Sequence, residues 1–141
     1  MLPSRYFIDL TQPEIAAQLK ANPLVILPAG SVEQHGPHLP TGTDIFASNV
    51  IGHAVAERMD GLVLPATPFG VTPMHMPFEG TISFTPDTYM RVVTETCVST
   101  ARHGAKYLLI LNWHEGNIPS LAIAAEALHR EHGMTVLTVQ A

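Results

Sequence analysis

Residues 27–44 read Leu27-Pro28-Ala29-Gly30-Ser31-Val32-Glu33-Gln34-His35-Gly36-Pro37-His38-Leu39-Pro40-Thr41-Gly42-Thr43-Asp44, and the rest of the chain is organised around them. They include three prolines and three glycines. Because proline lacks a backbone donor and fixes φ, this run is expected to be neither a regular helix nor a central strand. We therefore predict a loop, and four of its side chains are potential metal ligands: Glu33, His35, His38 and Asp44.

The spacing of these side chains favours a metal site. Glu33 and His35 lie two residues apart, so in an extended segment both point to the same side. Asp44 directly precedes an apolar helical pattern, at an expected N-cap position that holds a short carboxylate in place. Mixed carboxylate and imidazole ligands suit Zn, Mn or Fe better than Ca. The alternative is that Glu33 and Asp44 cap helices and that the histidines are ordinary loop residues.

The composition is that of one apolar-rich domain. The 141 residues are enough for a real core, and we expect residues 1–141 to form a single α/β domain. Hydrophobic residues make up 46% of the chain and charged residues 13%, which predicts a buried oligomer interface or a missing part of the chain. The net charge of −5 argues against nucleic acid or an anionic membrane as the main partner.

Nothing in the sequence indicates secretion or a membrane span. The N-terminus lacks the basic and apolar regions of a signal peptide, and no apolar run approaches the length of a transmembrane helix. The single cysteine, Cys97, excludes an intramolecular disulfide and is compatible with the cytosol. We therefore expect a cytoplasmic protein.

Apolar periodicity predicts alternating helices and strands. Helices are expected from the capping box at Thr11 to Asn22 and over residues 44–59, 85–103 and 119–132. Continuous apolar runs predict buried strands at residues 24–27, 62–64, 107–111 and 134–139. Such alternation predicts an α/β fold with a mostly parallel sheet and helices on both faces.

Two ligand-rich loops should meet at one edge of this sheet. Glu33 and His35 follow the first strand, whereas His114 and Glu115 follow the third. Because ligands of parallel sheets bind outside the carboxyl ends of the strands, the two loops should converge. The convergence strengthens the prediction of a metal site.

The last predicted strand ends two residues before Ala141, with no following helix to cover it. A buried parallel strand needs cover on both faces. We therefore expect either that the C-terminal part of a larger domain is absent or that a neighbouring subunit covers this face.

The motifs together resemble those of the creatininase (creatinine amidohydrolase) family. They are Glu33-x-His35-Gly36-x-His38-Leu39-Pro40-x-x-Thr43-Asp44, Gly70-Val71-Thr72-x-x-His75, Gly80-Thr81-Ile82-Ser83 and Asn112-x-His114-x-Gly116-Asn117. The resemblance covers essentially the whole chain and implies a dinuclear metal hydrolase on a Rossmann-like three-layer α/β sandwich, often a hexamer of identical subunits. Activities in the family include creatinine hydrolysis, deformylation in flavin and deazaflavin biosynthesis, and processing of the mycofactocin precursor peptide.

The resemblance also implies roles for individual residues. Asp44 would bridge two divalent ions of Zn, Mn or Fe, with Glu33 and His114 completing one ion and His35 serving the other. Creatininase itself has a further metal-binding glutamate two residues after the last histidine, where this chain has Gly116. This departure weakens the case for creatinine as the substrate. The family also continues past residue 141, with a His/Glu-rich motif that carries acid/base and metal or substrate contacts.

The implied reaction is hydrolysis of a small-molecule amide, either a cyclic amide or a formamide, by a metal-activated water. His38 and Glu115 are candidates for the general acid that protonates the leaving nitrogen. Thr72 and His75 are candidates for substrate contact. Three alternatives stay open: a peptidase of the mycofactocin-processing type, a metal-binding chain without turnover, and a loop held by hydrogen bonds alone.

Overall fold

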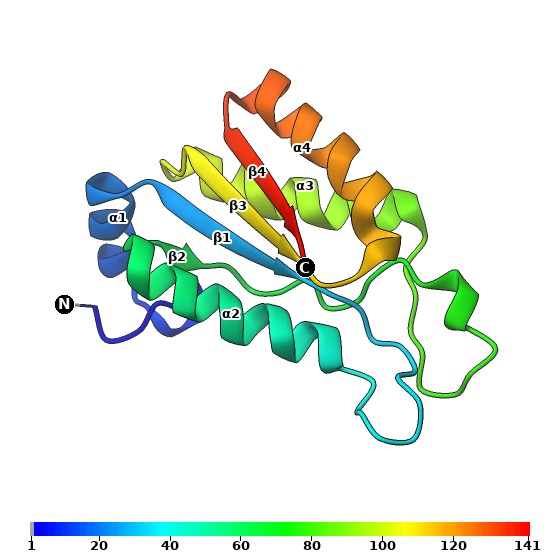
Figure 1. The fold of residues 1–141 in the computed structure, drawn as a ribbon. Coiled ribbons are helices and arrows are strands. Elements are labelled where there is room, and N and C mark those ends of the chain that lie inside the picture. The colour runs from blue at the N-terminus through cyan, green and yellow to red at the C-terminus, as the bar shows by residue number, and fades with distance from the viewer. Residues whose placement is uncertain (1) are drawn as a thin grey trace.

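The computed structural model describes residues 2–141, and its centre is a four-stranded, all-parallel sheet with helices on both faces (Figure 1). The strand order is β2-β1-β3-β4. The strands are β1 (Leu24–Ala29), β2 (Leu62–Val63), β3 (Tyr107–Asn112) and β4 (Thr135–Gln140). The α-helices are α1 (Gln12–Ala21), α2 (Thr43–Met59), α3 (Pro86–Arg102) and α4 (Ile118–His132), and three short 3-10 helices are η1 (Phe7–Asp9), η2 (Pro73–His75) and η3 (Glu115–Asn117). The predicted three-layer α/β class is confirmed.

The helix ends follow the signals in the sequence. Before α1, Thr11 and Glu14 form the expected capping box, in which the Thr11 backbone N–H donates to Glu14 Oε2 over 2.8 Å. Thr85 caps α3 by accepting from the Thr88 N–H, and α4 ends at Gly133 with a left-handed φ of 66°. No helix within residues 2–141 is both long and apolar enough to cross a membrane.

The alternating side chains of the central strands build two hydrophobic cores. Val25 and Ile110 belong to the face that packs against α1, α3 and α4, together with the fully buried Tyr89. Ile26 and Leu111 point to the opposite face, where α2 covers them. Successive residues of a strand point to opposite faces, so continuous apolar runs fill both cores.

Strand β1 extends two residues into the predicted loop, through Pro28 and Ala29. The expectation that no central strand contains this proline was therefore wrong. The Pro28 carbonyl oxygen accepts from the Thr67 N–H on the β2 side of the strand, beyond the last residue of β2. The backbone nitrogen of Pro28 has no hydrogen and faces this same side. Because β2 has already ended there, no strand needs a hydrogen bond from it.

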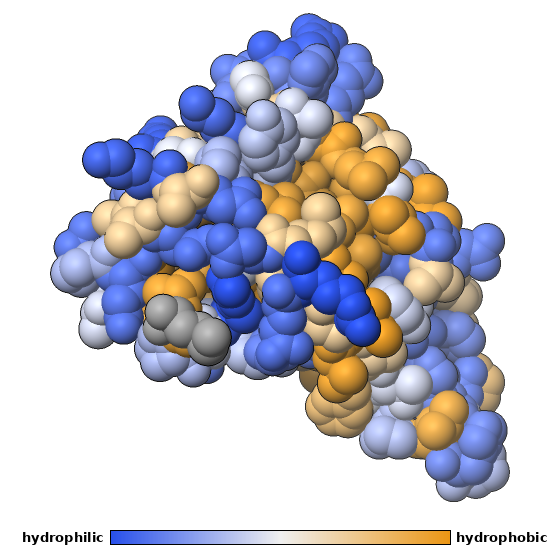
Figure 2. Space-filling view, turned by 60° about the vertical axis from the view of Figure 1, so that its left-hand side comes forward, coloured by the Kyte–Doolittle hydropathy of each residue, from blue (hydrophilic) through white to orange (hydrophobic). Residues whose placement is uncertain are grey.

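Strand β4 was expected to be a buried strand with no following helix to cover it. The uncovered apolar face is confirmed, whereas burial of the strand is not found within this chain. Val136 is partly buried against the core that includes α4, whereas Leu137 is 61% exposed and Val139 is 40% exposed. Helix α2 lies over β1 and β2, so the α2-side face of β4 has no helix against it (Figure 1). Figure 2 shows hydrophobic side chains gathered on the surface beside α4, and Leu137, Val139 and Val50 are exposed.

Burial of Cys97 predicts a pH dependence of stability. Burial raises the pKa of its thiol from 9.0 to about 12, so above pH 9 the unfolded chain loses this proton first and stability falls as pH rises. At pH 10 the free energy of unfolding should be lower by about 1.4 kcal/mol from this group alone. Urea melts at pH 8 and pH 10 should show this loss in the wild type and lack it in Cys97→Ala. Burial also raises the pKa of Tyr89, but that effect is common to both proteins and cancels. Equal losses in the two proteins would contradict the assignment.

Candidate metal centre

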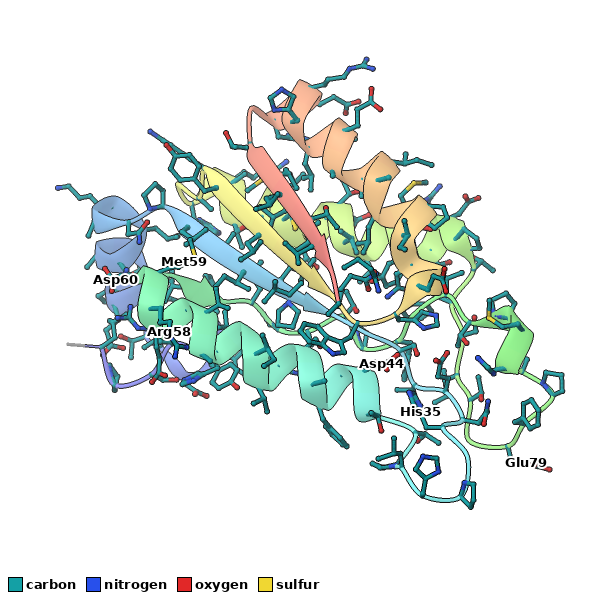
Figure 3. All side chains as sticks on the ribbon, viewed as in Figure 1. His35, Asp44, Arg58, Met59, Asp60 and Glu79 are labelled. Atoms are coloured by element: carbon teal, nitrogen blue, oxygen red, sulfur yellow. The ribbon has the colours of Figure 1, made fainter. Side chains whose placement is uncertain are left out.

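The predicted ligands meet at the carboxyl edge of the sheet. The loop after β1 carries Glu33 and His35, the first turn of α2 carries Asp44, and the residues after β3 include His114. Ligand atoms of Glu33, Asp44 and His114 all lie within 4.8 Å of one another, and the three residues are buried. Within residues 2–141, no other three or more His, Cys, Asp or Glu side chains form such a cluster. Figure 3 shows Asp44 and His35 side by side near the strand ends. The predicted convergence of the two loops is confirmed.

Asp44 is not at the N-cap, as its sequence position suggested, but is the second residue of α2. The helix begins at Thr43 because the Thr43 N–H and hydroxyl both donate to the Pro40 carbonyl oxygen, over 3.2 and 2.6 Å. A carboxylate in the first turn still benefits from the helix dipole. The Ser31 hydroxyl donates to Asp44 Oδ2 over 2.9 Å and fixes the side chain.

The ring of His114 is oriented for metal binding. Its Nε2 lies 2.9 Å from the Val71 carbonyl oxygen, which can only accept, so Nε2 carries the proton. The Nδ1 lone pair therefore faces Glu33 Oε2 at 3.3 Å and Asp44 Oδ2 at 3.6 Å. Three acceptors facing one another in a buried site require a proton or a cation between them. A backbone carbonyl bonded to the outer nitrogen is also typical of metal-ligating histidines.

His35 shows the same arrangement on the other side of Asp44. Its Nδ1 lies 3.1 Å from the Glu33 carbonyl oxygen, which places the proton of the neutral ring on Nδ1. The Nε2 lone pair then faces Asp44 Oδ1 at 3.1 Å. Asp44 thus turns Oδ1 toward His35 and Oδ2 toward His114. This is the arrangement that a bridging carboxylate would require.

Asn117 ties together the segments that carry the ligands. Its buried amide donates to the Gly30 carbonyl oxygen over 3.0 Å and to Asn112 Oδ1 over 3.2 Å, and it accepts from the Val71 N–H over 2.9 Å. It makes no side-chain cap bond to α4. Asn117 therefore holds the His114 loop against the neighbouring segments and does not cap the helix with its side chain.

A cavity of about 730 Å³ opens onto the cluster, and its walls include Met74, Trp113 and Pro119. Of the acid candidates, the exposed Glu115 lines this cavity, whereas the exposed His38 is not among the lining residues. Of the two substrate candidates, His75 lines the cavity. Thr72 is fully buried, and its hydroxyl donates to Glu33 Oε2.

Two residues of the site were missed by the sequence analysis, and for a third, Gly116, it found the departure from creatininase but not the structural reason. Ser31 binds Asp44, Gln34 binds His75, and Gly116 lies against His114. A Cβ atom at Gly116 would overlap the Val71 carbonyl oxygen and lie 2.6 Å from His114 Nε2. Serine, glutamine and glycine have no ligand chemistry that spacing could have revealed. The departure from creatininase at Gly116 was the one feature of the sequence that could have pointed to a special role of that residue.

Comparisons with known proteins agree with this geometry. The creatininase family, described as creatinine amidohydrolase, matches residues 8–141. A mycofactocin precursor peptide peptidase of Mycobacterium ulcerans (strain Agy99) is 36% identical over 118 residues, which cover 77% of this chain and 47% of that protein. A creatinine amidohydrolase of Pseudomonas putida is 33% identical over 115 residues, covering 77% of this chain and 44% of that protein.

The fold matches as well. A crystal structure of creatinine amidohydrolase superposes with a TM-score of 0.86 at 28% identity, covering 99% of this chain and 58% of that chain. The chain spans about half the length of the curated relatives that it matches. The parallel sheet, the ligand cluster at its carboxyl edge and the match over residues 8–141 lead to one conclusion: this chain belongs to the creatininase family of hydrolases.

Proposed function

We propose that this protein hydrolyses the C–N bond of a small amide, using divalent metal ions held by Glu33, Asp44, His114 and His35. The observation that carries the proposal is the set of buried oxygen and nitrogen acceptors that face one another without a donor between them. Carboxylate and imidazole ligands suit Zn, Mn or Fe. Similar creatininase structures include a zinc–zinc form and a manganese form, which supports the same metals here.

Glu33, Asp44 and His114 would hold one ion, and Asp44 with His35 would hold the second. A bound ion of this kind supplies a water-derived nucleophile near neutral pH and polarises the amide carbonyl. The protein orients the ligands through hydrogen bonds, from Ser31 to Asp44 and from Thr72 to Glu33. Because Thr72 is fully buried, we propose that it acts through Glu33 and not by touching the substrate.

Protonation of the leaving nitrogen requires a group in the cavity. Glu115 lines the cavity at the start of η3 and is the better placed of the two acid candidates, because His38 lies outside the lining. The apolar walls formed by Met74, Trp113 and Pro119 suit the non-reacting part of an amide. The exposed apolar side chains of α2 and β4 support the expected homo-oligomer.

A peptide substrate is the second candidate. It is favoured by the similarity to the Mycobacterium ulcerans peptidase, which slightly exceeds the similarity to the Pseudomonas putida creatinine amidohydrolase. The absence of a glutamate at position 116 also separates this chain from the pattern of creatininase. Both candidates use the same ligands and differ only in what occupies the cavity.

The test combines metal content with hydrolysis in one preparation. The chain should contain one to two equivalents of Zn, Mn or Fe by elemental analysis. It should hydrolyse at least one of three compounds: creatinine, formanilide or a short unmodified peptide. Treatment with a chelator should abolish turnover, and added Zn or Mn should restore it. Full metal occupancy without turnover would instead identify a chain that binds metal but is not catalytic. Full stability without any metal would mean that the loop carrying Glu33 and His35 is held by hydrogen bonds alone.

A further inference from the structure

Gln34 and His75 form a contact beside the ligand cluster, although 41 positions separate them in the sequence. Gln34 follows Glu33 directly, and its backbone N–H donates to the Thr81 hydroxyl, which ties it to the loop after β2. His75 is the last residue of η2 in that loop. The Gln34 side-chain nitrogen, Nε2, lies 3.1 Å from His75 Nδ1.

The backbone decides which way the Gln34 amide points. The Gly36 N–H donates to Gln34 Oε1 over 3.0 Å. The reversed amide would place its NH₂ group against this N–H, and two donors would then face each other. The Gln34 NH₂ group therefore donates to His75 Nδ1. A neutral imidazole that accepts at Nδ1 carries its proton on Nε2.

The Nε2–H group of His75 points toward the ligand cluster. His75 Nε2 lies 3.9 Å from Glu33 Oε2, which is too long for a hydrogen bond. The Nε2–H group of His75 therefore makes no hydrogen bond to this carboxylate. The His75 side chain is 30% exposed and lines the cavity. A nitrogen that carries a proton offers no lone pair to a metal, so the geometry makes His75 a donor and not a fourth ligand.

We propose that Gln34 is a positioning residue that holds His75 in the Nε2–H tautomer, and that His75 donates a hydrogen bond to the carbonyl oxygen of the bound amide. This oxygen gains negative charge as water attacks the carbonyl carbon. A donor already aimed at it therefore stabilises the transition state more than the bound substrate. The catalytic half of the proposal rests on the hydrolase function proposed above, whereas the tautomer does not.

The tautomer is measured by long-range ¹H–¹⁵N correlation spectra of the ¹⁵N-labelled chain loaded with Zn. The His75 signals are identified by their loss in His75→Gln. In the wild type they should show a protonated Nε2 and an unprotonated Nδ1. In Gln34→Glu the carboxylate can only accept, so His75 Nδ1 should gain a proton. The matched control is Gln12→Glu, an exposed position at the start of α1 with the same change in charge. A protonated His75 Nδ1 in the wild type would overturn the assignment.

The catalytic half is measured on the compound that the wild type hydrolyses. His75→Ala should lower kcat by about 100-fold, the usual effect of removing one donor to a developing oxyanion. Gln34→Glu should lower kcat by about 10- to 100-fold, with KM and metal content near those of the wild type. Unchanged kcat in His75→Ala would refute its role as a donor. If the wild type hydrolyses none of the three compounds, the proposed function fails, while the tautomer is still decided by the spectra.

Discussion

Replacing Asp44 with asparagine is expected to abolish binding at both proposed metal positions while leaving the fold intact. Asp44 is 5% exposed and turns one oxygen toward His35 and the other toward His114, so neither ion would keep a full set of anionic ligands. An asparagine keeps the shape of the side chain and can still accept from Ser31. Loss of a ligand should exceed the usual 10- to 100-fold cost of losing an outer hydrogen-bond partner, so we expect Zn affinity to fall by more than about 100-fold.

The effect on stability should depend on metal. Without metal, Asp44→Asn removes a negative charge that lies buried beside Glu33, so the apoprotein should unfold at the same temperature as the wild type or higher. With Zn, only the wild type should gain stability, because a ligand stabilises only the state that binds it. Isothermal titration and thermal melts with and without Zn measure both effects. The matched control is Asp87→Asn, an exposed aspartate in the first turn of α3, which should bind Zn like the wild type. Equal Zn binding by Asp44→Asn would exclude the bridging role.

Gly116→Ala is expected to damage the same centre by displacing His114. The added methyl group would overlap the Val71 carbonyl oxygen and lie 2.6 Å from His114 Nε2, so the hydrogen bond between these two groups could not survive. Without it the Nδ1 lone pair would no longer be held toward Glu33 and Asp44. We expect a loss of about 1–3 kcal/mol in the free energy of unfolding from overpacking. Zn affinity should fall by about 10- to 100-fold.

The control for this variant is Gly133→Ala, which follows α4 in a left-handed conformation with open space around it. It should cost about 1 kcal/mol in stability from backbone strain and leave Zn affinity unchanged. Comparing the two variants separates loss of stability from loss of the metal site. Gly116→Ala with wild-type Zn affinity would show that His114 does not depend on the Val71 contact. The same crowding explains why a glutamate, as in creatininase, cannot simply be restored at this position.

Much of the fold could be predicted from local patterns. The capping box at Thr11, the start of α3 at Thr85 and the end of α4 at Gly133 all lie where the sequence placed them. These signals are local, because a cap or a glycine turn depends on hydrogen bonds within a few residues. Two errors came from neighbours outside the local pattern. Pro28 continues β1 because β2 has already ended beside it, and β4 is exposed because α2 lies over β1 and β2.

The features of the candidate site also fall into those that the sequence predicts and those that depend on distant segments. By itself, the sequence determined the order of strands and helices, the side chains with ligand chemistry, and their convergence at one edge of the sheet, because chain direction in a parallel sheet dictates where each loop emerges. Only the tertiary structure decided that His114 turns Nδ1 inward, that Gly116 must lack a side chain, and that Gln34 orients His75. Each of these depends on atoms from segments far apart in the chain, which touch only after the loops have packed. Sequence periodicity describes the surroundings of one segment and carries no information about such contacts.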